Sequence, residues 1–130
     1  MKKIIALIIL ATLASIPIII LTKKTSSTPS TEQISKNITT VDGKQVITID
    51  AKGGYTPRKT DAKANTPTLL KIKTSGTFDC SSALVIPNLN YRKNLPPSGE
   101  TIVEVPPQKP GTNIRGLCSM GMFSFNIMFN

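Results

Sequence analysis

Three sulfur-bearing side chains lie at alternate positions near the C-terminal end of the chain: Cys118, Met120 and Met122. The only other cysteine is Cys80, and the 130-residue chain contains no histidine. Thiolate and thioether sulfur are soft ligands that favour Cu(I) over harder divalent ions, and the usual nitrogen ligand of zinc and Cu(II) sites is missing. The sequence therefore predicts a Cu(I) site built from these four residues.

The two cysteines also allow a second interpretation. Cysteines outside the cytoplasm often pair in disulfides that stabilise small β domains, and Cys80 and Cys118 taken alone favour such a bond. The two methionines favour the metal site instead, because a disulfide has no need of thioethers, whereas Cu(I) bound by two thiolates gains from a third, neutral sulfur. Both interpretations stay open here, and counting free thiols distinguishes them.

Other classes of function have little support in the residues. The chain has 16 Lys and Arg against 7 Asp and Glu, a formal charge of +9, which suits an anionic membrane surface. The basic residues are scattered, without aromatic residues between them or a nucleic-acid module, so we expect no nucleic-acid partner. No carboxylate pair or histidine base is present, so we expect no enzyme. Electron transfer is disfavoured because Cu(II) prefers nitrogen or oxygen ligands alongside thiolate.

The N-terminus has the pattern of a membrane anchor. Two lysines at positions 2 and 3 precede an uncharged run, 4–21, that would span roughly 27 Å as a helix. The run is longer than the apolar part of most signal peptides and has no small-x-small cleavage site. We therefore predict an uncleaved single-pass anchor over 1–22, with the rest of the chain on the extracytoplasmic side of the cell membrane. The polar stretch 23–37 is predicted to be a flexible linker.

From residue 38 to the C-terminus the pattern is that of short strands. Asp42-Gly43 between β-prone runs indicates a hairpin, and 67–73 alternates apolar with charged residues. Segment 59–63 has the pattern of an irregular edge. About seven strands are expected, at 38–41, 46–49, 67–73, 83–86, 101–105, 112–117 and 123–129. No stretch of 38–130 has helical periodicity, so we predict an all-β fold, an antiparallel sandwich or barrel.

Several short motifs resemble a known family. Gly54-Tyr-x-Pro57, Cys80 followed by Val85-Ile-Pro87, and Cys118-x-Met-Gly-Met122 are similar to the cupredoxin-like domains that carry a C-x-M-G-M loop. With the anchor in front, the whole chain resembles the membrane-anchored Cu(I) chaperones of streptococci. The spacing of the two cysteine segments is the most specific part of the resemblance.

The resemblance implies a cupredoxin-like Greek-key fold in which Cys80 occupies the position of the first histidine of a blue-copper protein. It further implies that Cys80 and Cys118 form the tighter Cu(I) site, while Met120 and Met122 help to build a second, weaker one. One or two Cu(I) ions are thus expected. The partner that it implies is a copper-exporting P-type ATPase, which would receive Cu(I) from this chain as part of copper resistance. We expect the chain to be a monomer.

Overall fold

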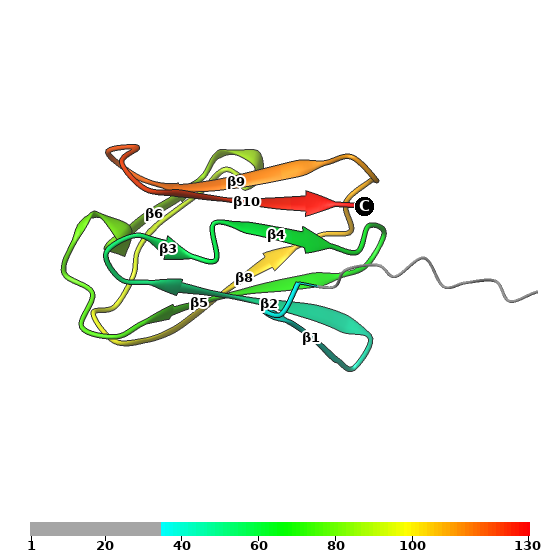
Figure 1. The fold of residues 1–130 in the computed structure, drawn as a ribbon, viewed down its shortest axis with the longest axis horizontal. Coiled ribbons are helices and arrows are strands. Elements are labelled where there is room, and N and C mark those ends of the chain that lie inside the picture. Colours follow the sequence, from blue (N-terminus) through cyan, green and yellow to red (C-terminus); the bar gives the residue numbers. More distant parts are fainter. Residues whose placement is uncertain (1–34) are drawn as a thin grey trace, which may run out of the picture. The chain divides into compact units, whose positions relative to one another are not determined.

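The computed structural model describes residues 35–130, which form an all-β sandwich of two sheets (Figure 1). The predicted anchor, 1–22, and most of the predicted linker, 23–37, lie outside the described residues. Within 35–130, no helix is long and apolar enough to cross a membrane. The end of the predicted linker is tied to the domain, because Asp61 N donates to Ser35 Oγ at 2.8 Å and Asn37 Nδ2 donates to Thr48 O at 3.0 Å.

The first sheet has five strands. Its order is β1 (Ile38–Val41), β2 (Lys44–Ala51), β5 (Thr68–Thr74) and β8 (Gly99–Val105), and β3 (Tyr55–Thr56) pairs with β2 outside this path. The expected hairpin joins β1 to β2 through Asp42 and Gly43, whose φ angles are 48° and 74°. Positive φ at both central residues is what a two-residue type I′ turn requires, which explains the choice of Asp-Gly.

The second sheet also has five strands, and it carries the C-terminal end of the chain. Its order is β4 (Lys59–Ala62), β10 (Ser124–Phe129), β9 (Asn113–Cys118), β6 (Ala83–Ile86) and β7 (Tyr91–Asn94). Two single-turn 3₁₀ helices flank β6: η1 (Cys80–Ser82) precedes it and η2 (Pro87–Leu89) follows it. The β9–β10 hairpin therefore places the loop after Cys118 at one end of this sheet (Figure 1).

The expectation of an antiparallel sandwich was wrong in one respect, because both sheets are mixed. β2 pairs with β5 in parallel, and β10 pairs with β4 in parallel. The physical reason is the crossover between β2 and β5: the chain passes to the second sheet as β4 and then returns. β5 consequently enters the first sheet in the same direction as β2. Segment 59–63, expected as an irregular edge, contains β4, which is the edge strand of its sheet.

The hydrophobic core lies between the two sheets. In β5, Leu70 and Ile72 are fully buried, while Lys73 is exposed. In β10, Phe125, Ile127 and Phe129 are fully buried. This alternation is the period of two that a strand with one buried face requires. The β9–β10 pair therefore has its position fixed by core packing as well as by backbone hydrogen bonds.

Candidate metal centre

Cys118 is the last residue of β9, and its side chain is fully buried. The backbone around it is paired on both sides: Cys118 N donates to Phe123 O at 3.0 Å, and Ser119 N donates to Ala83 O at 2.9 Å. Phe123 N also donates to Cys118 Sγ at 3.4 Å. A hydrogen bond to sulfur favours the thiolate over the thiol. Cys118 is thus held by the sheet itself.

Cys80 is held differently. It is the first residue of η1, its side chain is half-buried, and the preceding Asp79 caps the turn. Asp79 Oδ1 accepts hydrogen bonds from the backbone N and the side-chain Oγ of Ser81, the former at 2.8 Å. Asp79 Oδ2 accepts from Gly53 N at 2.9 Å. These bonds, led by the one from the Ser81 side chain, lower the pKa of the Asp79 carboxyl group.

Tyr55 also contacts the turn that carries Cys80. Its hydroxyl group donates to Ser81 O at 3.0 Å, and its ring packs edge-on against Phe125 with the ring centroids 5.2 Å apart. Burial, with a smaller contribution from the negative charge of Asp79, raises the pKa of Tyr55 above its usual value. The hydroxyl group therefore stays protonated and keeps donating over the whole neutral range.

The two cysteines meet at this end of the sandwich. Their Cα atoms are 5.8 Å apart although 38 positions separate them in the sequence, and their sulfur atoms are joined in a disulfide. The structure thus brings together the two residues predicted as the main ligands, and it does so in the bonded form that the second interpretation of the sequence expects. Binding of Cu(I) by both sulfurs requires the reduced, dithiol form, so the metal site stays a prediction.

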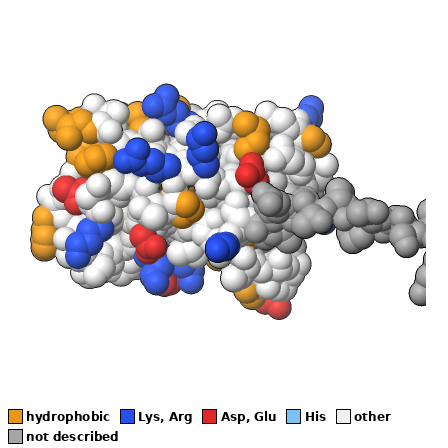
Figure 2. Space-filling view, in the orientation of Figure 1, with side chains coloured by type: hydrophobic (Ala, Val, Ile, Leu, Met, Phe, Trp, Pro, Cys, Tyr) orange, Lys and Arg blue, Asp and Glu red, His pale blue; other side chains and the backbone are white. Residues whose placement is uncertain are grey.

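The two methionines lie in the loop that joins β9 to β10. Met120 is 76 % exposed and Met122 is 66 % exposed. Gly121 between them has a φ of 73°, and its N–H group donates to Cys118 O at 2.8 Å, which closes a tight turn. Hydrophobic side chains are visible at this end of the molecule in the space-filling view (Figure 2). The loop therefore presents two thioethers to solvent beside the buried sulfur of Cys118.

Basic side chains line hollows on both sides of the loop that carries Met120 and Met122, which we call the sulfur loop. On one side, a cavity of about 170 Å³ is lined by Tyr55, Arg58, Met122, Phe123 and Ser124. On the other side, a hollow of about 380 Å³ is lined by Ala83, Val85, Arg92, Lys93, Asn94 and Ser119. Elsewhere on the face drawn in Figure 2, Lys and Arg side chains are spread out rather than gathered in one patch. Arg58, Arg92 and Lys93 are thus the basic residues that line the hollows beside the loop.

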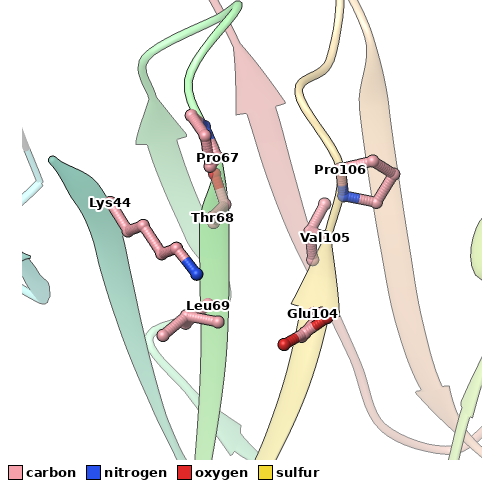
Figure 3. A pocket seen from close by; sticks show the side chains of 7 residues that line it. All are labelled: Lys44, Pro67, Thr68, Leu69, Glu104, Val105 and Pro106. Carbon is pink, nitrogen blue, oxygen red and sulfur yellow. The ribbon is translucent and has the colours of Figure 1, made fainter.

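A separate hollow of about 320 Å³ contains no sulfur ligand. It lies across the ends of β2, β5 and β8 and is lined by Lys44, Pro67, Thr68, Leu69, Glu104, Val105 and Pro106 (Figure 3). The Lys44 and Glu104 side chains approach it from β2 and β8, the strands on either side of β5, with Leu69 of β5 between them (Figure 3). A hollow with one ammonium, one carboxylate and apolar walls offers nothing that would select a soft metal ion.

Two residues of this region were not predicted as functional from the sequence. Asp79 is part of no functional motif. The only signal for it in the sequence is Asp79-x-Ser81, which is the pattern of a capped turn. Tyr55 entered only as part of the Gly54-Tyr-x-Pro57 resemblance. Asp79 contacts Gly53, and Tyr55 contacts Ser81. Each contact joins residues 26 positions apart in the sequence, and no local pattern indicates such contacts.

Comparison with known proteins identifies the class. The family model of the cupredoxin-like domain matches residues 4–126, so the chain belongs to the cupredoxin-like domain family. A comparison with curated protein sequences found no match.

Two solved structures are similar to this chain. One is the NMR solution structure of a copper binding protein in the apo form, with 25 % sequence identity, a TM-score of 0.64 and coverage of 72 % of this chain and 94 % of that one. The other is the crystal structure of the metal binding domain of CopA, a Cu(I) exporting P-type ATPase of Streptococcus pneumoniae, with Cu(I). Its identity is 18 %, its TM-score 0.63 and its coverage 72 % of this chain and 92 % of that one, a likeness in fold alone.

Proposed function

We propose that this protein is a membrane-anchored, extracytoplasmic Cu(I)-binding protein that acts as a copper chaperone or buffer and passes Cu(I) by ligand exchange to a copper-exporting transporter. The observation that carries the proposal is the meeting of Cys80 and Cys118, with Cα atoms 5.8 Å apart, at the loop that exposes two methionines. Copper is the cargo of such a protein, and no enzymatic role is proposed.

The environment of the cysteine pair suits a Cu(I) thiolate centre. A Cu(I) ion held by two thiolates is an anionic centre, which nearby positive charge and hydrogen-bond donors stabilise. Phe123 N–H already points at Cys118 Sγ, and Arg58 and Arg92 line the hollows on either side of the loop. Burial of Cys118 limits the access of water and of competing ligands to the ion.

The exposed methionines would provide a route by which Cu(I) enters and leaves the cysteine site. Thioethers are soft but neutral ligands, so Met120 and Met122 would bind Cu(I) more weakly than the two thiolates do. Their exposure allows an incoming ligand of another protein to reach copper while it is still bound here. They can also hold a second, weaker ion, as the resemblance to domains with a C-x-M-G-M loop implies.

The choice of partner rests on the similar fold. The metal binding domain of the Cu(I) exporting ATPase CopA has a fold like that of this chain. The acceptor would be a copper exporter in the same membrane as the predicted anchor, 1–22. Confining donor and acceptor to one membrane raises their effective concentration. A linker that is flexible over 23–34, the part before the residues tied to the domain, would give a reach of roughly 20 Å, from about 5–6 Å times the square root of the residue number.

The experiment on this role removes the anchor. Deleting 4–21 while keeping export should leave the Cu(I) affinity of the purified protein unchanged and should reduce the copper tolerance of cells. Replacing 4–21 by an unrelated membrane span is the matched control, and it should restore tolerance. Equal protection by the exported, anchorless protein would show that tethering is not part of the function.

A second function, an interaction domain stabilised by the Cys80–Cys118 bond and free of metal, is favoured by the disulfide in the structure. Thiol counting on freshly purified, unreduced protein separates the two functions. The copper function predicts two reactive thiols without copper and protection of both once Cu(I) is added. A disulfide that persists in cells, with no reactive thiols before or after copper exposure, supports the interaction domain instead.

A further inference from the structure

One short segment, Gly53 to Tyr55, contacts both cysteine segments. Toward Cys80, Gly53 N donates to Asp79 Oδ2 at 2.9 Å and the Tyr55 hydroxyl group donates to Ser81 O at 3.0 Å. Toward Cys118, the backbone of Gly54 lies against the Phe123 ring, because a Cβ atom built on Gly54 would be 3.5 Å from Phe123 Cδ1. We call Gly53–Tyr55 the strut, since it joins the two segments that carry the sulfurs.

The two cysteines depend on the strut to different degrees. Cys118 is fixed by strand pairing, whose hydrogen bonds belong to the backbone. Outside its own turn, the η1 segment has one backbone bond, from Leu95 N to Ser82 O at 2.7 Å. Besides the disulfide to Cys118, its remaining hydrogen bonds from outside the turn, within the described residues, involve the side chains of Asp79 and Tyr55. Side-chain hydrogen bonds therefore contribute more to the position of Cys80 than to that of Cys118.

We propose that Asp79 and Tyr55 are positioning residues, which hold the Cys80 turn on the strut and so keep the Cys80 sulfur within reach of the Cys118 sulfur. Neither residue is proposed as a ligand of Cu(I). Two groups held in one arrangement behave as if at high effective concentration, which favours any product that needs both. The disulfide is one such product and a two-thiolate Cu(I) complex is another. The Cu(I) part rests on the proposed function, whereas the disulfide part does not.

Asp79→Asn tests the tie to the strut with little change of shape. The carboxylate uses one oxygen for Ser81 and the other for Gly53, but an amide has a single oxygen and can satisfy only one side. Tyr55→Phe is an independent variant, since it keeps the ring beside Phe125 and removes only the donor to Ser81 O. Asp50→Asn, at an exposed position of β2, is the control that removes the same charge elsewhere.

The first measurement uses no copper. Full-length protein is equilibrated with mixtures of reduced and oxidised glutathione, and the equilibrium constant for disulfide formation is determined. Asp79→Asn should lower this constant by about threefold to tenfold, and a tenfold change corresponds to a reduction potential about 30 mV less negative. Tyr55→Phe should lower it by about threefold, and Asp50→Asn should leave it unchanged. Thermal unfolding of each disulfide-bonded variant verifies that it is folded.

The second measurement is Cu(I) affinity of the reduced proteins, by competition with a chelator. Asp79→Asn should weaken binding by about tenfold, in the range that loss of an outer-shell partner costs. Loss of charge alone would act in the opposite direction, because removing a carboxylate beside an anionic centre favours that centre. Weaker binding by this variant thus reports position and not charge.

The outcomes separate the two proposals. If wild-type protein binds no Cu(I) but the disulfide equilibrium shifts as expected, the positioning role stands and the copper function fails. If Asp79→Asn and Tyr55→Phe are both folded and both keep the wild-type disulfide equilibrium, the positioning role is wrong, whatever copper does.

Discussion

The two cysteines of the candidate metal centre are built into the fold in contrasting ways. Cys118 ends a strand, is fully buried and is held by backbone hydrogen bonds. Cys80 begins a single turn and is half-buried, and apart from its bond to Cys118 its turn is held by the carboxylate of Asp79 and the hydroxyl group of Tyr55. A backbone contact survives most substitutions, whereas a side-chain contact is lost with one. The Cys118 half of the site is therefore fixed by strand pairing, whereas the position of the Cys80 half can be changed by single substitutions.

The largest expected effect comes from removing either sulfur. Cys80→Ser and Cys118→Ser should each lower Cu(I) affinity by more than ~100-fold, beyond the usual cost of losing an outer-shell partner, because a thiolate ligand and its charge are lost. Competition with a Cu(I) chelator measures the change, and Ser119→Ala, an exposed neighbour of Cys118, is the matched control.

The same two variants should also differ in the free energy of unfolding, which compares the surroundings of the two cysteines. With both proteins reduced, Cys118→Ser should destabilise the fold more than Cys80→Ser, because a hydroxyl group would replace a fully buried sulfur. Denaturant unfolding measures this difference. If Cys80→Ser kept full Cu(I) affinity, the metal would have to be bound within the Cys118–Met122 loop alone, and the two-sided site would be wrong.

Much of the fold, and the position of the loop after Cys118, could be predicted from the sequence. The Asp42-Gly43 hairpin and the strand alternation around Leu70 and Ile72 follow from local chemistry, and the structure confirms both. The loop after Cys118 was expected between two strands, and it lies between β9 and β10. These features are predictable because turn residues and apolar period act over a few positions.

The rest depends on contacts that no local pattern contains. β7 is a polar edge strand with only Tyr91 half-buried, so it lacks an apolar period. β3 has two residues and follows the Gly53-Gly54 break. The two parallel pairings depend on which strand lies beside which, and alternation within a strand carries no such information. The ties of Asp79 and Tyr55 to the cysteine turn were missed for the same reason.

An intermediate effect, on the stability of the fold, is expected from placing a larger side chain in β9, the strand that ends in Cys118. Gly116 lies in β9 directly opposite Phe125 of β10, and a Cβ atom at Gly116 would overlap the Phe125 ring. Gly116→Ala should lower the free energy of unfolding by about 1–3 kcal/mol, since overpacking forces a buried ring to move. Denaturant titration of the disulfide-bonded protein measures it. Asn113→Ala, exposed on the same strand, is the control, and equal stability of both variants would contradict this packing.

The smallest effect on tight binding is expected in the exposed loop. Met120→Ala and Met122→Ala should leave the affinity for the first Cu(I) within a few-fold of the wild type, because neutral thioethers are weaker ligands than thiolates. They should lower the stoichiometry or the affinity of a second ion, as measured by titration with Cu(I) at high protein concentration. Met128→Ala, on β10 outside the loop, is the control. A loss of the first ion in the loop variants would place a methionine in the tight site.

The most direct test of a soft, all-sulfur site is a comparison of metals on the reduced protein. A chain that begins at Lys23 is titrated with Cu(I) in the presence of a Cu(I) chelator and, separately, with Zn(II) in the presence of a zinc indicator. Two thiolates with neighbouring thioethers and no histidine should give tight Cu(I) binding and weak Zn(II) binding. An affinity for Zn(II) comparable to that for Cu(I) would contradict the account.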